Sequence, residues 1–381
     1  MPRKILVSAG EASGDLYASL VVEELRRKDP DAEFFGCTGP KLRAAGVETI
    51  VDAADLAVVG LVEVVRDIPR IYGEYRKLLR AAEERKPDVA VVTDSPDFHL
   101  RVARRLHRMG VRTVYLVAPQ AWAWRKWRVK AMARDLDRLL CIFPFEEQFF
   151  RNEGVKATYI GHPLAGRVRP ALSRDEFFRK HRLAVERPLV AVLPGSRRGE
   201  AARHLPVVLD AVDRLYRDQA LNFVLPASAI AGADFFRERT GSSPVRVIDG
   251  ESWDAMAHAD LALPASGTVT VEAALLGTPM VTYYKVTAPS WVMGKLLVRT
   301  PFYSMVNLIA GRRVVPELMQ GAMTGEALAR EASRLLLDSA ARAEMKKGLE
   351  EVAQKLAGHD PAPLAASIVQ EVLEGQVAHV S

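Results

Sequence analysis

Short apolar segments alternate along the chain with longer segments in which apolar residues recur at helical spacing. This alternation predicts strands separated by helices. Strands that are apolar on both sides are typical of parallel sheets covered by helices on both faces. The strand candidates of the first half are Lys4–Ala9, Glu33–Thr38, Asp88–Thr93, Arg112–Val117 and Arg138–Ile142. Those of the second half are Leu189–Leu193, Asn222–Leu225, Val245–Ile248, Leu261–Leu263 and Met280–Tyr283.

The length of 381 residues is too great for one hydrophobic core and suits two domains. We predict an α/β fold with two doubly wound, Rossmann-like parallel-sheet domains facing a cleft, where ligands meet the carboxyl ends of the strands. The polar, proline-marked stretch from Gly166 to Pro188 marks the join. The expected N-terminal domain spans residues 1–165 and could be completed by the C-terminal helices 350–381. The expected C-terminal domain spans residues 166–349.

Composition narrows the class of protein. A hydrophobic content of 49% and a charged content of 26% are typical of a soluble globular protein. Cys37 and Cys141 both lie in apolar runs, which predicts buried thiols in a reducing compartment. No apolar run reaches the ~18 residues of a membrane span, and the N-terminus has no signal-peptide core. We therefore expect a cytoplasmic protein.

The net charge of +6 is unevenly distributed. The stretch from Phe98 to Arg134 holds ten Lys or Arg and no acidic residue, and residues 273–316 are also free of acids. Such stretches indicate an anionic partner: a nucleotide, a phosphorylated lipid, a membrane surface or a nucleic acid. In the second stretch cations alternate with Trp291, Leu296, Leu297, Phe302 and Tyr303, which favours lipid headgroups. A second membrane candidate is the helix bearing Ile68, Ile71, Tyr75 and Leu78 with Arg66, Arg70, Lys77 and Arg80, although such a stripe usually packs into a core.

The segment from Leu193 to Glu200 has the pattern of a strand that enters a helix through a glycine-bearing loop. Gly195 can adopt a positive φ, and Ser196 is a suitable N-cap. Free N–H groups at a helix start attract phosphate, and the planar Arg197 guanidinium can grip phosphate oxygens. An ordinary loop with a solvated arginine is the alternative.

A similar loop follows the strand at Leu261. Ser266, Gly267 and Thr268 stand at a predicted helix start, with Glu272 one turn inside the helix. The Ser266–Thr268 amides could face a phosphate while the Glu272 carboxylate accepts both hydroxyls of a ribose. Helix capping by Glu272 is the alternative. Two such loops at strand ends in one half of the chain favour nucleotide binding.

The first half has two further loops of interest. Glu11 lies in the small-residue loop Ser8–Asp15, where it could bind sugar hydroxyls or a catalytic neighbour, or simply cap a helix. That loop lacks the Gly-x-Gly-x-x-Gly spacing of nicotinamide-cofactor sites. Asp94 ends a strongly apolar strand, where a carboxylate could act as general base toward a hydroxyl. Asp97, next to Pro96, is expected to be a turn or N-cap residue.

Six motifs together resemble those of the lipid-A-disaccharide synthases. These are Ser8–Asp15, Asp94–Phe98, Pro119–Arg128 with its Trp-Ala-Trp-Arg core, Leu193–Glu200, Ala265–Glu272 and Asn307–Arg312. The resemblance implies an inverting glycosyltransferase of the two-domain GT-B type at the inner-membrane face of Gram-negative bacteria. The implied reaction joins UDP-2,3-diacylglucosamine to 2,3-diacylglucosamine 1-phosphate (lipid X), giving a β-1,6-linked disaccharide phosphate and UDP.

By motif position, the resemblance assigns the base to Asp94 and UDP contacts to Arg197, Glu272 and Asn307, and it places Glu11 in the first glycine-rich loop. From the loops themselves we expect Gly195, Ser196, Glu200, Ser266, Gly267 and Thr268 to contact UDP as well. We expect no cofactor and no metal, since no histidine pair has ligand spacing and both Asp-x-Asp strings fall at helix ends or polar turns. The expected location is the cytoplasm, peripherally on the inner membrane, with a homodimer left open.

Two other hypotheses about the function remain. A different GT-B enzyme that uses UDP-GlcNAc, either an epimerase or the peptidoglycan GlcNAc transferase, would share the nucleotide-binding half. A basic protein that binds nucleic acid would need neither Asp94 nor Glu272, and its binding would weaken steeply with salt.

Overall fold

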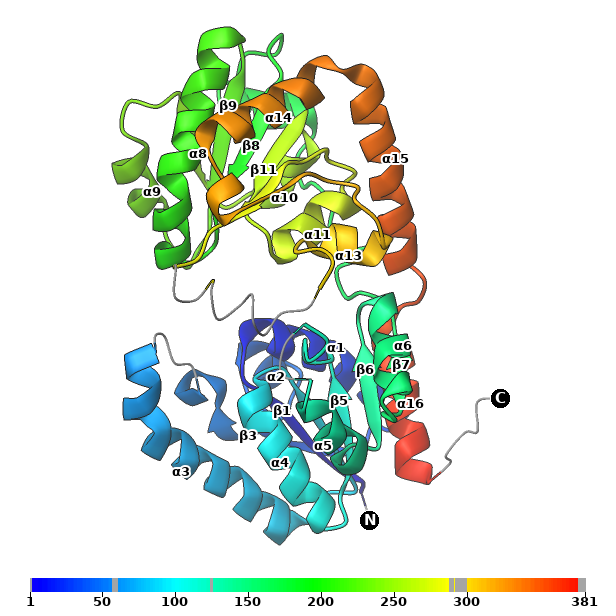
Figure 1. Ribbon diagram of the computed structural model, residues 1–381. Coiled ribbons are helices and arrows are strands. Elements are labelled where there is room, and N and C mark those ends of the chain that lie inside the picture. Colours follow the sequence, from blue (N-terminus) through cyan, green and yellow to red (C-terminus); the bar gives the residue numbers. More distant parts are fainter. Residues whose placement is uncertain (1, 57–60, 124–125, 288–290, 292–299, 376–381) are drawn as a thin grey trace. The chain divides into compact units, whose positions relative to one another are not determined.

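The computed structural model describes residues 2–56, 61–123, 126–287, 291 and 300–375, with only the backbone of 61–67. The chain divides into two compact units. Unit 1 comprises Met1–Pro163 and Gly358–Ser381, and unit 2 comprises Leu164–Ala357 (Figure 1). The chain therefore passes from one unit to the other twice.

Unit 1 is built on a seven-stranded sheet in the order β3-β2-β1-β4-β5-β6-β7, in which every pair is parallel. Its strands are β1 (Lys4–Ala9), β2 (Glu33–Thr38), β3 (Glu48–Asp52), β4 (Val89–Thr93), β5 (Arg112–Leu116), β6 (Arg138–Cys141) and β7 (Ala157–Tyr159). The central strands β1 and β4 are almost entirely buried, as expected for a sheet covered on both faces.

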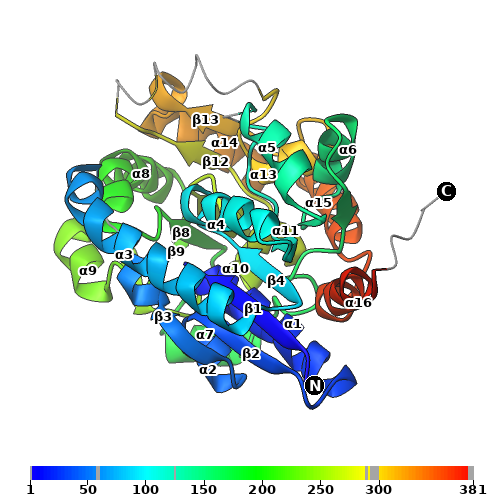
Figure 2. The same cartoon turned by 90° about the horizontal axis from the view of Figure 1, so that it is seen from below.

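Helices cover both faces of this sheet (Figures 1 and 2). The helices are α1 (Ala12–Lys28), α2 (Pro40–Ala44), α3 (Leu61–Arg85), α4 (Pro96–Arg108), α5 (Arg128–Asp135), α6 (Pro144–Asn152) and α16 (Pro361–Glu374), with the 3-10 turn η1 (Ala53–Leu56). Helices α1 and α16 pack together against one face, while α3, α4 and α5 pack against the other. The C-terminal helix α16 thus completes the first unit.

Unit 2 has a parallel four-stranded sheet in the order β10-β9-β8-β11 and a two-stranded sheet, β12-β13. Two isolated bridges, Ala262 to Met280 and Ala265 to Tyr283, connect the segment around β12 to β11. The strands are β8 (Leu189–Leu193), β9 (Asn222–Ala227), β10 (Val245–Asp249), β11 (Leu261–Pro264), β12 (Thr282–Tyr284) and β13 (Glu317–Met319).

The helices of unit 2 form two groups around the four-stranded sheet. Helices α8, α9 and α14 pack together, and α7, α10 and α11 lie against the sheet as the second group. The helices are α7 (Arg174–Lys180), α8 (Arg198–Asp218), α9 (Ala233–Thr240), α10 (Ser252–Ala257), α11 (Thr268–Leu275), α13 (Met305–Ala310), α14 (Gly325–Leu337) and α15 (Ser339–Leu356), with the 3-10 turn η2 (Gln320–Ala322).

The predicted α/β fold with parallel sheets is confirmed, and each predicted strand overlaps an observed one. Three strands were not predicted: β3, β7 and β13. The first two are the edges of the seven-stranded sheet, where one side of a strand stays polar and the apolar run is short. Cys37 and Cys141 are buried free thiols, as expected.

Candidate active site

Each unit has two candidate loops, which follow neighbouring strands at the point where the strand order reverses. In unit 1 the chain leaves β1 toward β2 and leaves β4 toward β5, so the loops after the neighbouring strands β1 and β4 diverge. In unit 2 the same holds for β8, which leads to β9, and its neighbour β11, which leads to β12. Such switch points are the usual ligand sites of doubly wound sheets.

Asp94 follows β4 at the switch point of unit 1. Its Oδ1 accepts a hydrogen bond from the Gly10 N–H at 2.8 Å, and its Oδ2 accepts one from the Glu11 N–H at 3.1 Å. Helix α1 begins at the next residue, so the carboxylate lies at the positive end of that helix. The Asp94 side chain is 10% exposed, which leaves an acidic group reachable from solvent in an otherwise buried place.

The pKa of Asp94 is raised to about 7, chiefly because burial penalises the charged form. The hydrogen bonds from Gly10 and Glu11 act in the opposite direction, and the negative charge of Glu11 raises the pKa further. A carboxyl group with this pKa is partly ionised at neutral pH and holds a proton far better than an ordinary aspartate. These are the properties required of a general base toward a hydroxyl.

Two glycines let helix α1 approach Asp94 this closely. A Cβ on Gly14 would lie 1.7 Å from Asp94 Oδ2, and a Cβ on Gly10 would lie 2.5 Å from Ser95 Oγ. The glycines of the Ser8–Asp15 loop are therefore explained by their close approach to the Asp94 carboxylate and its neighbour Ser95, and not by a dinucleotide-binding motif.

We expect Gly14→Ala to lower kcat at least tenfold, because the new methyl group must displace the Asp94 carboxylate from its amide partners. The free energy of unfolding should also fall by about 1–3 kcal/mol, the usual cost of overpacking. Gly73→Ala on α3 is the matched control, since its Cβ would meet no atom within 4 Å. Steady-state rates and thermal melts of the two variants check this; equal rates would contradict it.

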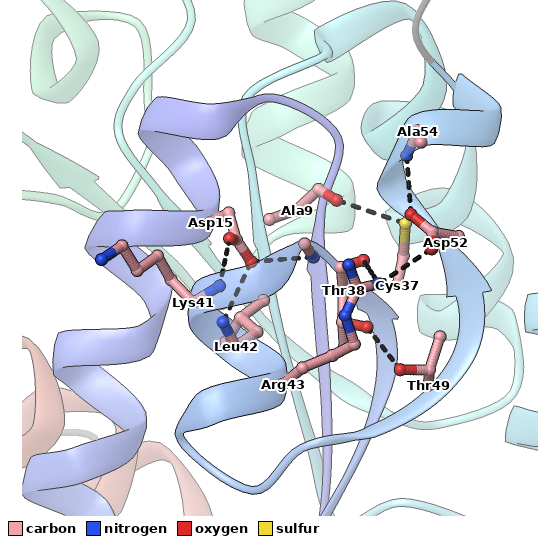
Figure 3. A network of polar contacts seen from close by, with 11 residues as sticks. Ala9, Asp15, Cys37, Thr38, Lys41, Leu42, Arg43, Thr49, Asp52 and Ala54 are labelled. Carbon is pink, nitrogen blue, oxygen red and sulfur yellow. Dashed lines mark hydrogen bonds and ion pairs between the residues drawn. The ribbon is translucent and has the colours of Figure 1, made fainter.

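Asp15, the second acidic residue of the Ser8–Asp15 segment, has a structural role (Figure 3). It is 1% exposed, and its carboxylate accepts hydrogen bonds from the N–H groups of Gly39, Lys41 and Leu42 at the start of α2. Arg43 on α2 in turn pairs with Asp52 at the end of β3. This network ties the ends of β2 and β3 to α1 and so fixes the loop that faces Asp94.

Glu11 stands at the cap position of α1, where its side chain is exposed and makes no capping hydrogen bond. Of the two alternatives left by the sequence, the helix-start carboxylate agrees with this position, although Glu11 forms no side-chain capping hydrogen bond.

In unit 2, Gly195 has a φ of +125°, a conformation that favours glycine. Its Cβ would meet Glu200 Cγ at 2.6 Å, so Glu200 packs against the loop from the first turn of α8. The expected N-cap was wrong by one residue: α8 begins at Arg198, with Arg197 at the cap position. The Ser196 carbonyl instead accepts a hydrogen bond from Ser228. Ser196 and Arg197 are both exposed at the helix start.

His204 holds this loop in place. Its Nδ1 lies 2.8 Å from the Pro194 carbonyl oxygen, and its Nε2 lies 3.0 Å from the Lys285 backbone nitrogen and 3.2 Å from the Lys285 carbonyl oxygen. The Pro194 carbonyl oxygen can only accept, so Nδ1 carries a proton and donates to it. Burial lowers the pKa of His204 and so favours the neutral ring.

The loop after β11 only partly matches its prediction. The Ser266 N–H donates to the Tyr283 carbonyl at 2.8 Å, so it does not face a phosphate as expected. Gly267 is the cap residue and Thr268 begins α11. Glu272 is mostly buried, and the one hydrogen bond described for its carboxylate comes from the Trp253 indole N–H at 2.9 Å. Burial raises the pKa of Glu272.

Asn307 lies differently from the expectation of a UDP contact. It is 0% exposed; its Oδ1 accepts from the N–H groups of Val314 and Val315, and its Nδ2 donates to Val315 and Glu317. All four bonding positions of the amide are used within the protein. In this structure Asn307 orders the segment 314–317 instead of facing a ligand.

The structure describes the two membrane-contact candidates from the sequence to different extents. On α3, Leu78 is buried and Ile71 and Tyr75 pack against the core, whereas Ile68 and Tyr72 are 54% and 58% exposed. In the other candidate, Trp291, Phe302 and Tyr303 are described, but Leu296, Leu297, Lys295 and Arg299 lie outside the described residues, as do Trp124 and Arg125 of the tryptophan motif. Within the part of the chain that the structure describes, no helix is long and apolar enough to cross a bilayer.

Three supporting residues could not be recognised from the sequence: Asp15, His204 and Trp253. Each is a polar or aromatic side chain on the buried side of a helix. Gly39, directly after β2, was the one signal for Asp15, because a glycine there allows a close approach.

The comparison with known sequences decides the family. The family model described as lipid-A-disaccharide synthetase matches residues 5–372. A lipid-A-disaccharide synthase of Solibacter usitatus is 76% identical over 379 residues, which cover 99% of this chain and 100% of that protein. The chain belongs to the lipid-A-disaccharide synthase family. A second synthase of this name, from Koribacter versatilis, is 45% identical over 93% of each chain.

Solved structures confirm the fold expected of a synthase of this family. An S. aureus MnaA–UDP co-structure has a TM-score of 0.67 at 12% identity and covers 99% of this chain and 98% of its own. The calicheamicin glycosyltransferase CalG4 has a TM-score of 0.63 at 17% identity, with 99% of each chain covered. These neighbours are GT-B glycosyltransferases and epimerases, so the chain has the GT-B fold of its enzyme family.

Proposed function

We propose that this chain transfers 2,3-diacylglucosamine from its UDP derivative to the 6-hydroxyl of 2,3-diacylglucosamine 1-phosphate, forming the β-1,6 disaccharide 1-phosphate and UDP. The observation that carries the proposal is the partly exposed Asp94 carboxylate at the switch point of unit 1, with its pKa near 7. Family membership supplies the two substrates.

In the reaction, Asp94 takes the proton of the acceptor 6-hydroxyl as that oxygen attacks the anomeric carbon of the donor. The bond from this carbon to the UDP oxygen breaks on the opposite side, so the configuration inverts. The proton ends on Asp94 and the electron pair of the broken bond on UDP. A pKa near 7 permits both the uptake of the proton and its later release to solvent.

Unit 2 is the proposed UDP-binding half. Gly195, Ser196 and Arg197 at the start of α8 are exposed or partly exposed, which suits them to receive the diphosphate. Gly267 and Thr268 at the start of α11 form a second set of amides, and the Glu272 carboxylate lies one turn further as a ribose acceptor. Arg197 and these amides would stabilise the charge that develops on the leaving UDP. Glu200 supports the first of these loops by packing against Gly195, and Asn307 orders the segment 314–317.

Unit 1 is the proposed acceptor half and carries the proposed membrane contact. Ile68 and Tyr72 are exposed on α3 beside Arg70, which combines apolar and cationic groups on one helix. We expect binding to anionic vesicles at low salt, on the cytoplasmic face of the inner membrane. Ile68→Ser with Tyr72→Ser should weaken co-sedimentation at least fivefold, while Val185→Ser, an exposed apolar site of unit 2, should not. Equal sedimentation of all three proteins would refute the contact.

The proposal is tested by mixing the purified chain with the two acylated sugars. We expect one UDP per tetraacyl disaccharide 1-phosphate, measured by mass spectrometry. A parallel sample with UDP-GlcNAc alone tests the epimerase alternative, for which the product would be an isomeric UDP-sugar. No UDP release with the acylated pair would refute the proposal.

A further inference from the structure

The main-chain carbonyl oxygen of Asp94 is held by two buried side chains. The Tyr115 hydroxyl donates to it at 2.5 Å, and His99 Nδ1 lies 3.1 Å from it. Tyr115 comes from β5 and His99 from α4, and both are 0% exposed. Neither residue reaches the surface, so neither is placed to touch a substrate.

The tautomer of His99 follows from its partners. The carbonyl oxygen cannot donate, so Nδ1 must carry the proton and Nε2 must accept from the Ser8 hydroxyl, 2.7 Å away. Burial lowers the pKa of His99 to about 4, so the ring is neutral at physiological pH and has this single N–H. A continuous line of hydrogen bonds therefore runs from Ser8 on β1 through His99 to Asp94.

The carbonyl needs such support because the backbone around it is strained. Asp94 has a φ of +52° and Ser95 a φ of +35°, two successive left-handed residues without a glycine. This turn directs the Asp94 side chain toward the Gly10 and Glu11 amides. A relaxed turn would move the carboxylate away from them.

We infer that Tyr115 and His99 are positioning residues for the proposed base: by donating to the same carbonyl oxygen they hold the left-handed turn that keeps the Asp94 carboxylate at the start of α1. The inference rests on the proposed function for its effect on rate. Its structural part, the environment of the Asp94 carboxylate, can be measured without any substrate.

The variants are Tyr115→Phe, which removes one donor, and His99→Leu, which removes the other. His99→Asn should keep the kcat that His99→Leu loses, because the asparagine amide N–H can occupy the place of Nδ1 and donate to the Asp94 carbonyl oxygen. Thr113→Val is the matched control: it deletes a buried hydroxyl two residues along the same strand, one that donates to Val111 at 3.4 Å and not to Asp94.

We expect Tyr115→Phe and His99→Leu each to lower kcat about tenfold, because each removes one hydrogen bond to the Asp94 carbonyl oxygen. KM for both substrates should not change. His99→Asn and Thr113→Val should stay within about threefold of the original rate. A released carboxylate becomes hydrated, so its pKa, raised chiefly by burial, should fall and the acidic limb of kcat should move to lower pH. A variant that merely folds less well would lose rate without moving this limb.

The titratable groups around Asp94 do not account for the acidic limb of the kcat–pH profile. The groups facing Asp94 are Glu11 on the preceding loop, Cys37 on β2, Tyr115 on β5 and His99 on α4. Burial raises the pKa of Cys37 and of Tyr115 and lowers that of His99, so none of these three changes charge near pH 7. Glu11 is present in every variant.

The substrate-free measurement is a ¹³C NMR titration of the aspartate carboxyl carbons, with Asp94→Asn to assign the Asp94 signal. Lower pKa values in Tyr115→Phe and His99→Leu, but not in Thr113→Val, support the inference. An unchanged Asp94 titration in both variants overturns it. If the original protein forms no disaccharide, the proposed function fails while this titration still decides the inference.

Discussion

Asp94→Asn should lower kcat by about three orders of magnitude while UDP still binds, because the amide cannot accept the acceptor's proton. The side chain keeps its volume, and the proposed UDP loops belong to the other unit. The rate of the unaltered enzyme should rise with pH through about 7, where the Asp94 carboxyl loses its proton, and level off above it. The residual rate of the Asn variant should lack this rise.

Asp97→Asn is the matched control for this substitution. Asp97 is three residues away and its side chain is 69% exposed, but it pairs with Arg128, whose side chain is only 9% exposed. Asp97→Asn should therefore lower the free energy of unfolding while changing kcat by no more than about threefold. Steady-state kinetics and calorimetric titration with UDP separate rate from binding. If Asp94→Asn keeps a near-original rate, another group takes the proton, and Glu11 is then the nearest exposed carboxylate to examine.

The second large effect is expected for Arg197→Ala. This exposed arginine stands at the start of α8, where its guanidinium can bind two oxygens of the diphosphate at once. Losing a charge-assisted pair of this kind costs about 1.5–3 kcal/mol, which corresponds to roughly a 10- to 150-fold fall in kcat/KM for the donor. KM for the acceptor should not change.

Two further variants distinguish phosphate binding from general charge. Arg197→Lys keeps the charge but loses the planar fork, so it should recover only part of the loss. Arg214→Ala removes another exposed arginine of α8, one that pairs with Asp210, and should leave the donor kinetics unchanged. Equal losses from Arg197→Ala and Arg214→Ala would indicate a long-range charge effect and contradict the assignment.

The fold could largely be predicted because its central strands are apolar on both sides. β1, β2 and β8 begin and end at their predicted residues, since each is a clear apolar run closed by a turn. The edge strand β3 was missed because Glu48 and Thr49 are exposed, so its pattern is that of a loop. The order of the strands comes from pairings between distant segments, which hydrophobic patterning does not encode.

In the candidate site, too, the local pattern predicts some residues, while contacts between distant segments could not be predicted. Asp94 and Gly195 could be located because Asp94 directly follows the strongly apolar strand β4 and Gly195 follows the strongly apolar strand β8 after one proline. The contacts of Asn307 and of Ser266 could not, since their partners Glu317 and Tyr283 are brought to them only by folding. Tyr115 and His99 were hidden for a similar reason. Tyr115 lies within the apolar run of β5 and His99 on the buried side of the amphipathic helix α4, where a buried polar group has the same pattern as a core residue.

In the proposed reaction unit 2 binds UDP and unit 1 supplies the base. A crystal structure with UDP tests this most directly. We expect the diphosphate at the Gly195–Arg197 turn and the ribose hydroxyls at Glu272, with Asp94 untouched by the nucleotide. UDP bound instead at the Gly10–Glu11 loop, with the Gly195–Arg197 turn empty, would contradict this assignment of the two units.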